Sequence, residues 1–321
     1  MRVLSGIQPS GALHLGNFFG MMEKMINYQE QNDLFCFIAN YHAMTSLNDG
    51  QALARGTLEA AANFIALGLD PEKSTFWVQS DVPEVQELTW ILSNFTPMGL
   101  LERCHSYKDK VAQGISPNHG LFAYPVLMTA DILLFQSDRV PVGKDQKQHL
   151  EVARDIAIRF NNQHGDIFTI PEPEIDDQVA TIPGQDGRKM SKSYGNTIDL
   201  FQPEKALRKQ VMRIVTDPTP VEEAKDPDSC NLFQLFRLFL KQKETEALRQ
   251  RYQTPGMRYG DVKQELFETV RDFFAPYAEK RQALLENPDE LRSILARGAD
   301  KARDQANKTL REVRKKCGLS Y

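Results

Sequence analysis

The segment Pro9-Ser10-Gly11-Ala12-Leu13-His14-Leu15-Gly16-Asn17 is the most informative stretch of the first half of this chain. It follows an apolar run that includes Val3 and Leu4, and it precedes an amphipathic stretch, so it predicts a turn from a strand into a helix. Glycines at such a turn let the backbone approach a ligand closely, and the start of a helix directs free N–H groups at anionic oxygens. An ordinary polar turn around His14 is the alternative.

Beyond this turn, short apolar runs alternate with helical patterns. The runs at 34–39, 75–78 and 139–142 predict strands. Strands that alternate with helices are joined by parallel crossovers. We therefore expect an α/β fold with a Rossmann-type doubly wound parallel sheet, which binds ligands at the carboxyl ends of its strands. From Pro203 onward the pattern is almost wholly helical, and this predicts a second, all-helical domain.

A second informative segment, Lys189-Met190-Ser191-Lys192-Ser193, lies in a stretch rich in proline and glycine. Two lysines and two serines on such a loop can close over a polyphosphate, although basic loops are often merely solvated. The two segments complement each other chemically. His14 and Asn17 supply imidazole and amide donors for one end of a nucleotide, and the lysines supply ammonium donors for the other end.

A carboxylate stands on an otherwise apolar helix face between these segments. Tyr124, Met128 and Asp131 are spaced at i, i+4 and i+7, so they share one face of a helix expected near 121–136. Indole has one N–H donor and no acceptor, so an ionised Asp131 suits it, and a phenyl ring would leave that carboxylate unpaired. A capped or salt-bridged structural acid is the alternative.

Composition narrows the classes of protein further. The chain has 321 residues, a formal net charge of −4 and four scattered cysteines with no CxxC pair. An RNA partner would therefore need local positive charge, and the cysteines are typical of a reducing compartment. We expect a cytoplasmic protein without a membrane segment or signal peptide. The basic end of the chain, 308–316, is typical of a solvated helix face, and direct contact with RNA is the alternative.

Several segments together closely resemble the bacterial tryptophanyl-tRNA synthetases, which are class I aminoacyl-tRNA synthetases. The resemblance covers essentially the whole chain and includes the two signatures above (HIGH-type and KMSKS), Gly6 to Gly11, Tyr41 to Ala43, Tyr124 to Leu133 and Val140 to His149. It implies activation of L-tryptophan with ATP and Mg²⁺ to give tryptophanyl-adenylate and pyrophosphate, followed by transfer to the 3′ end of tRNA(Trp). It also implies a homodimer.

The motifs and the resemblance together assign the site residues. Catalysis falls to His14, Asn17, Lys110, Lys189, Ser191 and Lys192. ATP binding falls to Gln8, Pro9, Ser10, Gly16, Asn17, Gly143, Lys144, Asp145, Ile182, Lys189, Met190, Ser191, Lys192 and Ser193. Tryptophan binding falls to Asp131, Met128, Tyr124, Gln146, His42 and Gln8. No protein metal site is expected.

The expected domains follow from the same patterns. We expect residues 1–185 to form the catalytic domain, 186–200 the loop and linker, and 201–286 a helical domain, which the resemblance implies reads the anticodon. Residues 287–321 form a C-terminal helix that packs back towards the catalytic domain.

The chain departs from the family at two points. Many bacterial members have Thr where this chain has His14, which leaves the chemistry intact. Some members bind an iron–sulfur cluster through spaced cysteines, whereas Cys230 lacks such companions, so we expect no cluster.

Other functions remain open at this point. A tyrosyl-tRNA synthetase would share the signatures, but Met128 argues against its phenol pocket. A small-molecule nucleotidylyltransferase would need neither the helical half nor the lysine loop. A non-charging regulator that binds tryptophan or RNA would have no need of that loop either.

Overall fold

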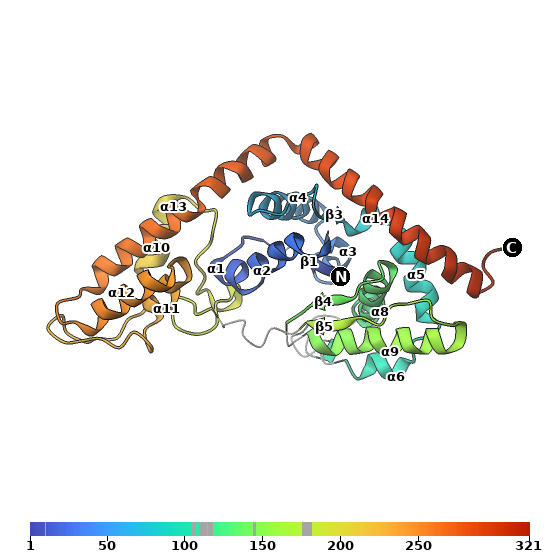
Figure 1. The fold of residues 1–321 in the computed structure, drawn as a ribbon, viewed down its shortest axis with the longest axis horizontal. Coiled ribbons are helices and arrows are strands. Elements are labelled where there is room, and N and C mark those ends of the chain that lie inside the picture. Colours follow the sequence, from blue (N-terminus) through green and yellow to red (C-terminus); the bar gives the residue numbers. More distant parts are fainter. Residues whose placement is uncertain (10, 105–106, 109–113, 115–117, 144–145, 175–181) are drawn as a thin grey trace. The chain divides into compact units, whose positions relative to one another are not determined.

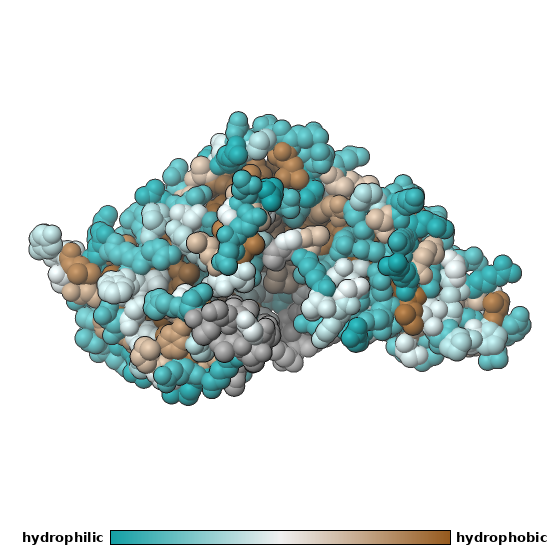
Figure 2. All heavy atoms as spheres, turned by 180° about the vertical axis from the view of Figure 1, so that it is seen from behind, coloured by the Kyte–Doolittle hydropathy of each residue, from teal (hydrophilic) through white to brown (hydrophobic). Residues whose placement is uncertain are grey.

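The computed structural model describes the whole chain except residues 10, 105–106, 109–113, 115–117, 144–145 and 175–181 (Figure 1). The chain divides into two compact units. The first unit comprises Met1–Ser10, Met25–Asp177 and Leu284–Tyr321, and the second comprises Gly11–Lys24 and Gln178–Ala283. Figure 2 shows hydrophilic residues over much of one face, with hydrophobic ones scattered among them.

The first unit is built on a five-stranded parallel sheet with the strand order β3-β2-β1-β4-β5. The strands are β1 (Arg2–Ile7), β2 (Asp33–Ile38), β3 (Thr75–Val78), β4 (Arg139–Pro141) and β5 (Glu172–Glu174). Five consecutive residues of β2, Leu34 to Ile38, are buried, as expected for a parallel strand covered on both faces. The order reverses between β1 and β4, and such a switch point is where doubly wound sheets bind ligands. The predicted fold class is confirmed.

Helices cover this sheet on both faces. They are α3 (Asn40–Ala43), α4 (Gly50–Ala66), α5 (Glu84–Ser93), α6 (Met98–Glu102), α8 (His119–Leu134), α9 (Lys147–His164) and α14 (Pro288–Lys316). Helix α14 supplies Ala299, Ala302, Ala306, Leu310 and Val313 to the core of this unit. The C-terminal helix therefore packs on the sheet unit (Figure 1).

Helix α14 approaches the edge strand β3 at a glycine. A Cβ atom added to Gly298 would lie 1.7 Å from the carbonyl oxygen of Phe76 in β3. No side chain fits at that separation, so the helix backbone rests directly on the strand. This covers a sheet edge that would otherwise be open to pairing with another chain.

The second unit is helical. It contains α1 (Leu15–Asn17), a π-helical turn (Phe18–Met22), α10 (Glu204–Met212), α11 (Asn231–Phe236) and α12 (Gln242–Gln253). Helix α2 (Glu23–Asn27) joins the two units along the chain, and most of α13 (Tyr259–Glu286) belongs to the second.

The membership of Gly11–Lys24 differs from the expected boundary, which placed all of 1–185 in the catalytic domain. The cause is an aromatic cluster. Phe18 packs edge-on against Phe274 with ring centroids 5.3 Å apart, and Phe19 does the same against Phe239 at 5.1 Å. Phe273 lies within the same cluster. We refer to these five rings as the aromatic cluster of the second unit.

Candidate active site

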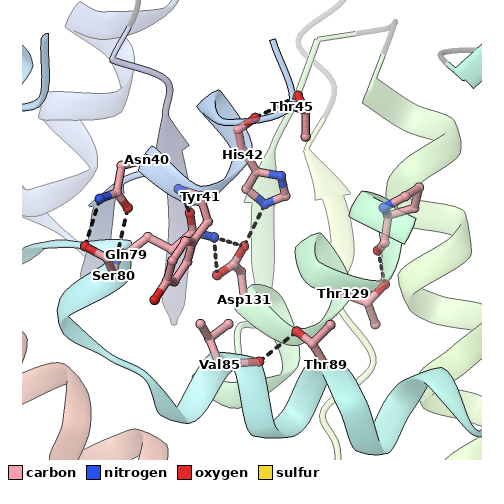
Figure 3. Close-up of polar contacts among 11 residues, drawn as sticks. Asn40, Tyr41, His42, Thr45, Gln79, Ser80, Val85, Thr89, Thr129 and Asp131 are labelled. Carbon is pink, nitrogen blue, oxygen red and sulfur yellow. Dashed lines mark hydrogen bonds and ion pairs between the residues drawn. The ribbon is translucent and has the colours of Figure 1, made fainter. Parts of the chain in front are cut away.

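A buried carboxylate lies near the carboxyl edge of the sheet. Asp131, on α8, is 2% exposed. Its Oδ2 lies 2.9 Å from Nε2 of His42, and Nε2 of Gln79 lies 3.0 Å from Oδ1 and 2.8 Å from Oδ2 (Figure 3). His42 belongs to α3, which follows β2, and Gln79 directly follows β3. Two neighbouring strands and one helix thus bring three polar side chains together.

These contacts favour the ionised acid. Burial is the largest influence and raises the pKa of Asp131 above its ordinary value, and the hydrogen bonds from His42 and Gln79 offset part of that rise. A buried carboxylate without donors would be costly, and these two donors reduce that cost. His42 was expected to contact the amino acid, and in this structure it contacts Asp131.

Tyr124 and Gln146 are joined through a buried histidine. The hydroxyl of Tyr124 lies 2.7 Å from Nε2 of His149, and Nδ1 of His149 lies 3.0 Å from Oε1 of Gln146. An amide oxygen only accepts, so Nδ1 carries the hydrogen, and in a neutral ring Nε2 then accepts the tyrosine proton. His149 is 1% exposed, and it therefore fixes the hydrogen-bond direction of two residues expected to bind tryptophan.

Other predicted residues of the first unit lie near the switch point of the sheet. Gln8 and Pro9 follow β1, and Gly143 follows β4, the strand beside it. Met128 is partly buried on α8 and packs against the core of this unit. Ser10, Lys110, Lys144 and Asp145 lie outside the described residues.

In the second unit, the two sequence signatures are in contact. The backbone N–H of Gly16 donates to Sδ of Met190 at 3.3 Å. Leu15 N–H donates to the carbonyl of Ile198 at 2.9 Å, and Leu200 N–H donates to that of Leu13 at 2.9 Å. A Cβ atom on Gly11 would lie 3.1 Å from Nζ of Lys192. The folded chain therefore brings together segments that are far apart in sequence.

His14 is buried beside this loop. Burial lowers its pKa, the charge of Lys192 lowers it further, and Asp199 acts in the opposite direction. Among the described residues, no hydrogen-bond partner faces its Nδ1. Asn17 accepts the backbone N–H of His14 through Oδ1 at 3.1 Å, so its amide N–H groups keep their donor capacity for other partners.

A buried asparagine holds the lysine loop in shape. Asn196 donates to the carboxylate of Asp186 at 2.7 Å and to the carbonyl of Lys189 at 3.1 Å, and it accepts from Ser191 N–H at 2.8 Å. The backbone carbonyl of Ile182 accepts a hydrogen bond from the backbone N–H of Met190 at 2.9 Å. The side chains of Ser191 and Ser193 lie 2.8 Å apart. Lys189, Lys192 and Ser193 are exposed on this loop.

Three polar residues with clear structural roles were not among the predicted site residues. They are Gln79, His149 and Asn196, all at most 3% exposed. Gln79 had a detectable signal, because it is a polar residue directly after a buried strand, where doubly wound sheets place their sites. Asn196 and its partner Asp186 flank the lysine motif in sequence, but only the folded loop reveals their contact.

The comparison with known proteins decides the family. The model of "tRNA synthetases class I (W and Y)" matches residues 1–275. The chain belongs to the class I tRNA synthetases. A tryptophan–tRNA ligase of Campylobacter jejuni is 56% identical over 99% of this chain and 100% of its own length. One of Fusobacterium nucleatum is 50% identical over 99% and 98%. The predicted resemblance is confirmed.

Solved structures agree with this synthetase over its full length. A Campylobacter jejuni tryptophanyl-tRNA synthetase, crystallised with ADP and tryptophan, has a TM-score of 0.96 and 56% identity and covers 99% of this chain and 100% of its own. The Mycoplasma pneumoniae enzyme has a TM-score of 0.82 and 30% identity, over 99% and 98%. In the described part of this synthetase, no helix is long and apolar enough to cross a membrane.

Proposed function

We propose that this synthetase is a tryptophan–tRNA ligase. A carboxylate oxygen of L-tryptophan attacks the α-phosphorus of ATP, the bond to the β-phosphate breaks, and pyrophosphate leaves. The tryptophanyl group then passes to the 3′ end of tRNA(Trp), and AMP leaves. The observation that carries this proposal is the buried carboxylate of Asp131, held by two donors on the helix that also carries Tyr124 and Met128.

The amino-acid site of this proposal lies in the first unit. Asp131 accepts the indole N–H, and Met128 packs against the ring. Tyr124, Gln146, His42 and Gln8 complete this set. When Tyr124 donates its proton to His149, its oxygen can act as an acceptor, and an acceptor oxygen suits the ammonium group of an amino acid.

The phosphate chemistry needs positioning and charge rather than a protein nucleophile. In the second unit, we assign ATP contacts to His14, Gly16, Asn17, Ile182 and Lys189 to Ser193. In the first unit, the ATP contacts are Gln8, Pro9 and Gly143, and Ser10, Lys144 and Asp145 are added from sequence alone. Lys110 is likewise assigned from sequence alone, as a contact of the pyrophosphate. The catalytic residues are His14, Asn17, Lys110, Lys189, Ser191 and Lys192.

Magnesium enters with ATP in this proposal. The described residues hold no group of three His, Cys, Asp or Glu side chains that could form a metal site of their own. Mg²⁺ usually keeps several waters and binds through substrate phosphates. The ion neutralises charge on the phosphates, while the side chains above orient them.

The roles of the larger parts are also proposals. Residues 201–286 read the anticodon, and α10 supports this with the exposed basic residues Lys205, Arg208 and Lys209. The enzyme acts as a homodimer in the cytoplasm. Two large apolar side chains on the surface of the first unit, Trp90 at 74% and Met98 at 63% exposure, support self-association.

Pyrophosphate exchange with each of the twenty amino acids tests the activity. We expect tryptophan to support exchange at least about 100-fold faster than tyrosine or phenylalanine, because phenylalanine leaves Asp131 without a donor and Met128 offers no hydrogen bond to the phenol of tyrosine. Charging of tRNA(Trp) is then measured separately. Exchange that follows tyrosine would contradict the proposal, and exchange without charging would favour a regulatory protein.

A further inference from the structure

Gln79 has an amide whose orientation is fixed by its partners. Its Oε1 lies 3.0 Å from the backbone nitrogen of Tyr41, and a backbone N–H can only donate. The carbonyl end of the amide therefore faces Tyr41, and the NH₂ end faces Asp131 (Figure 3). At 1% exposure, Gln79 is shielded from water that could compete for these bonds.

The donors around Asp131 leave one acceptor position on a defined oxygen. Each carboxylate oxygen accepts about two hydrogen bonds. Oδ2 accepts hydrogen bonds from His42 and Gln79. Among the described residues, Oδ1 accepts a hydrogen bond from Gln79 alone. Gln79 bridges both oxygens and so fixes the rotation of the carboxylate. One lone pair of Oδ1 then matches the single N–H of an indole.

We propose that Gln79 is a positioning residue for the selection of tryptophan, which orients the Asp131 carboxylate so that Oδ1 accepts the indole N–H. This inference rests on the proposed function. Gln79 never touches the reacting atoms, and it acts through Asp131. Its removal therefore weakens the recognition of an N–H group rather than the phosphate chemistry.

The fold offers a matched control at the same junction. Asn40 donates to Oγ of Ser80 at 2.8 Å and accepts from Ser80 N–H at 3.1 Å, so it ties α3 to the turn Gln79–Asp81 without contacting Asp131. This tie remains when Gln79 is replaced. Asn40→Ala removes a comparable set of bonds next to the site but leaves the carboxylate and both of its donors in place.

The test compares tryptophan with its benzothiophene analogue, in which sulfur replaces the indole N–H. Pyrophosphate exchange is measured for wild type, Gln79→Met, Gln79→Glu and Asn40→Ala. In both Gln79 variants we expect the KM for tryptophan to rise about tenfold, with kcat and the KM for ATP within about twofold of wild type. The preference for tryptophan over the analogue falls by a similar factor, and Asn40→Ala keeps it.

Gln79→Glu keeps the shape of the side chain, so the test stands even when Gln79→Met fails to fold. An unchanged KM for tryptophan, or an equal loss for both substrates, would overturn the role of Gln79 while the wild type still activates tryptophan. Wild-type exchange that does not depend on tryptophan would instead contradict the proposed function, and with it this inference.

Discussion

At the scale of single residues, the surroundings of His14 favour the neutral form of its imidazole. Burial and Lys192 hold its pKa below the ordinary value of 6.5. As the pH falls below that value, the unfolded chain binds a proton that the folded chain still excludes. The free energy of unfolding therefore decreases towards acid pH, and the contribution of His14 is lost fully once the pH passes its folded pKa.

We predict that His14→Asn reduces this acid sensitivity. The melting temperature of the wild type should fall more steeply between about pH 7 and pH 5.5 than that of the variant, because only the wild type has an imidazole to titrate. Thermal unfolding followed by circular dichroism across that range measures both slopes. Parallel slopes would show that His14 titrates alike in the folded and unfolded chains.

The sequence predicted the residues of the candidate site but not the hydrogen-bond partners that orient them. Spacing along one helix was enough to place Tyr124, Met128 and Asp131 on α8, because helical periodicity is local. The partners of these residues come from distant segments. Gln79 is 52 residues from Asp131, and His149 is 25 residues from Tyr124. Such contacts depend on strand order, which residue spacing does not determine.

At the scale of elements, the packing of α14 on β3 depends on the absence of one side chain. We predict that Gly298→Ala lowers the free energy of unfolding by about 3 kcal/mol or more, because the added methyl group collides with the backbone of Phe76 and cannot rotate away. Urea unfolding measures the change.

The control for this prediction is Gly260→Ala in α13. A Cβ atom there meets nothing within 4 Å, so alanine should be neutral or stabilise by about 0.5–1 kcal/mol. A similar small effect at Gly298 would mean that α14 shifts easily along the strand.

Strand β5 shows why some elements were not predicted. Residues 172–174 follow Pro171 and include Pro173, and the sequence pattern predicted no strand there. Pro173 nevertheless sits in β5, where it pairs with Val140 of β4. An edge strand tolerates proline, because an edge position leaves some N–H groups without a ladder partner. By contrast, β2 contains a continuous apolar run without proline, so the sequence pattern predicted it as a strand.

At the scale of the whole molecule, each unit has its own core. Both tryptophans of the chain, Trp77 and Trp90, lie in the first unit, so tryptophan fluorescence reports on that unit. Phe274 belongs to the aromatic cluster of the second unit and is 2% exposed. The two units can therefore be followed separately during unfolding.

We predict that Phe274→Ala destabilises the second unit by about 3–5 kcal/mol, through the cavity it leaves among the other rings. The transition seen by far-ultraviolet circular dichroism should broaden or split towards lower temperature, while the transition seen by fluorescence stays in place. Coincident shifts in both signals would mean that the whole chain unfolds as one cooperative block.

The membership of Gly11–Lys24 in the second unit limits how this enzyme can be recombined with its relatives. A hybrid gene with a single crossover near residue 177 would pair Phe18 and Phe19 from one parent with Phe273 and Phe274 from the other. Where the two parents differ in side-chain size at these positions, the rings would no longer pack closely against one another. A hybrid that keeps the aromatic cluster intact takes residues 11–24 and 178–283 from the same parent.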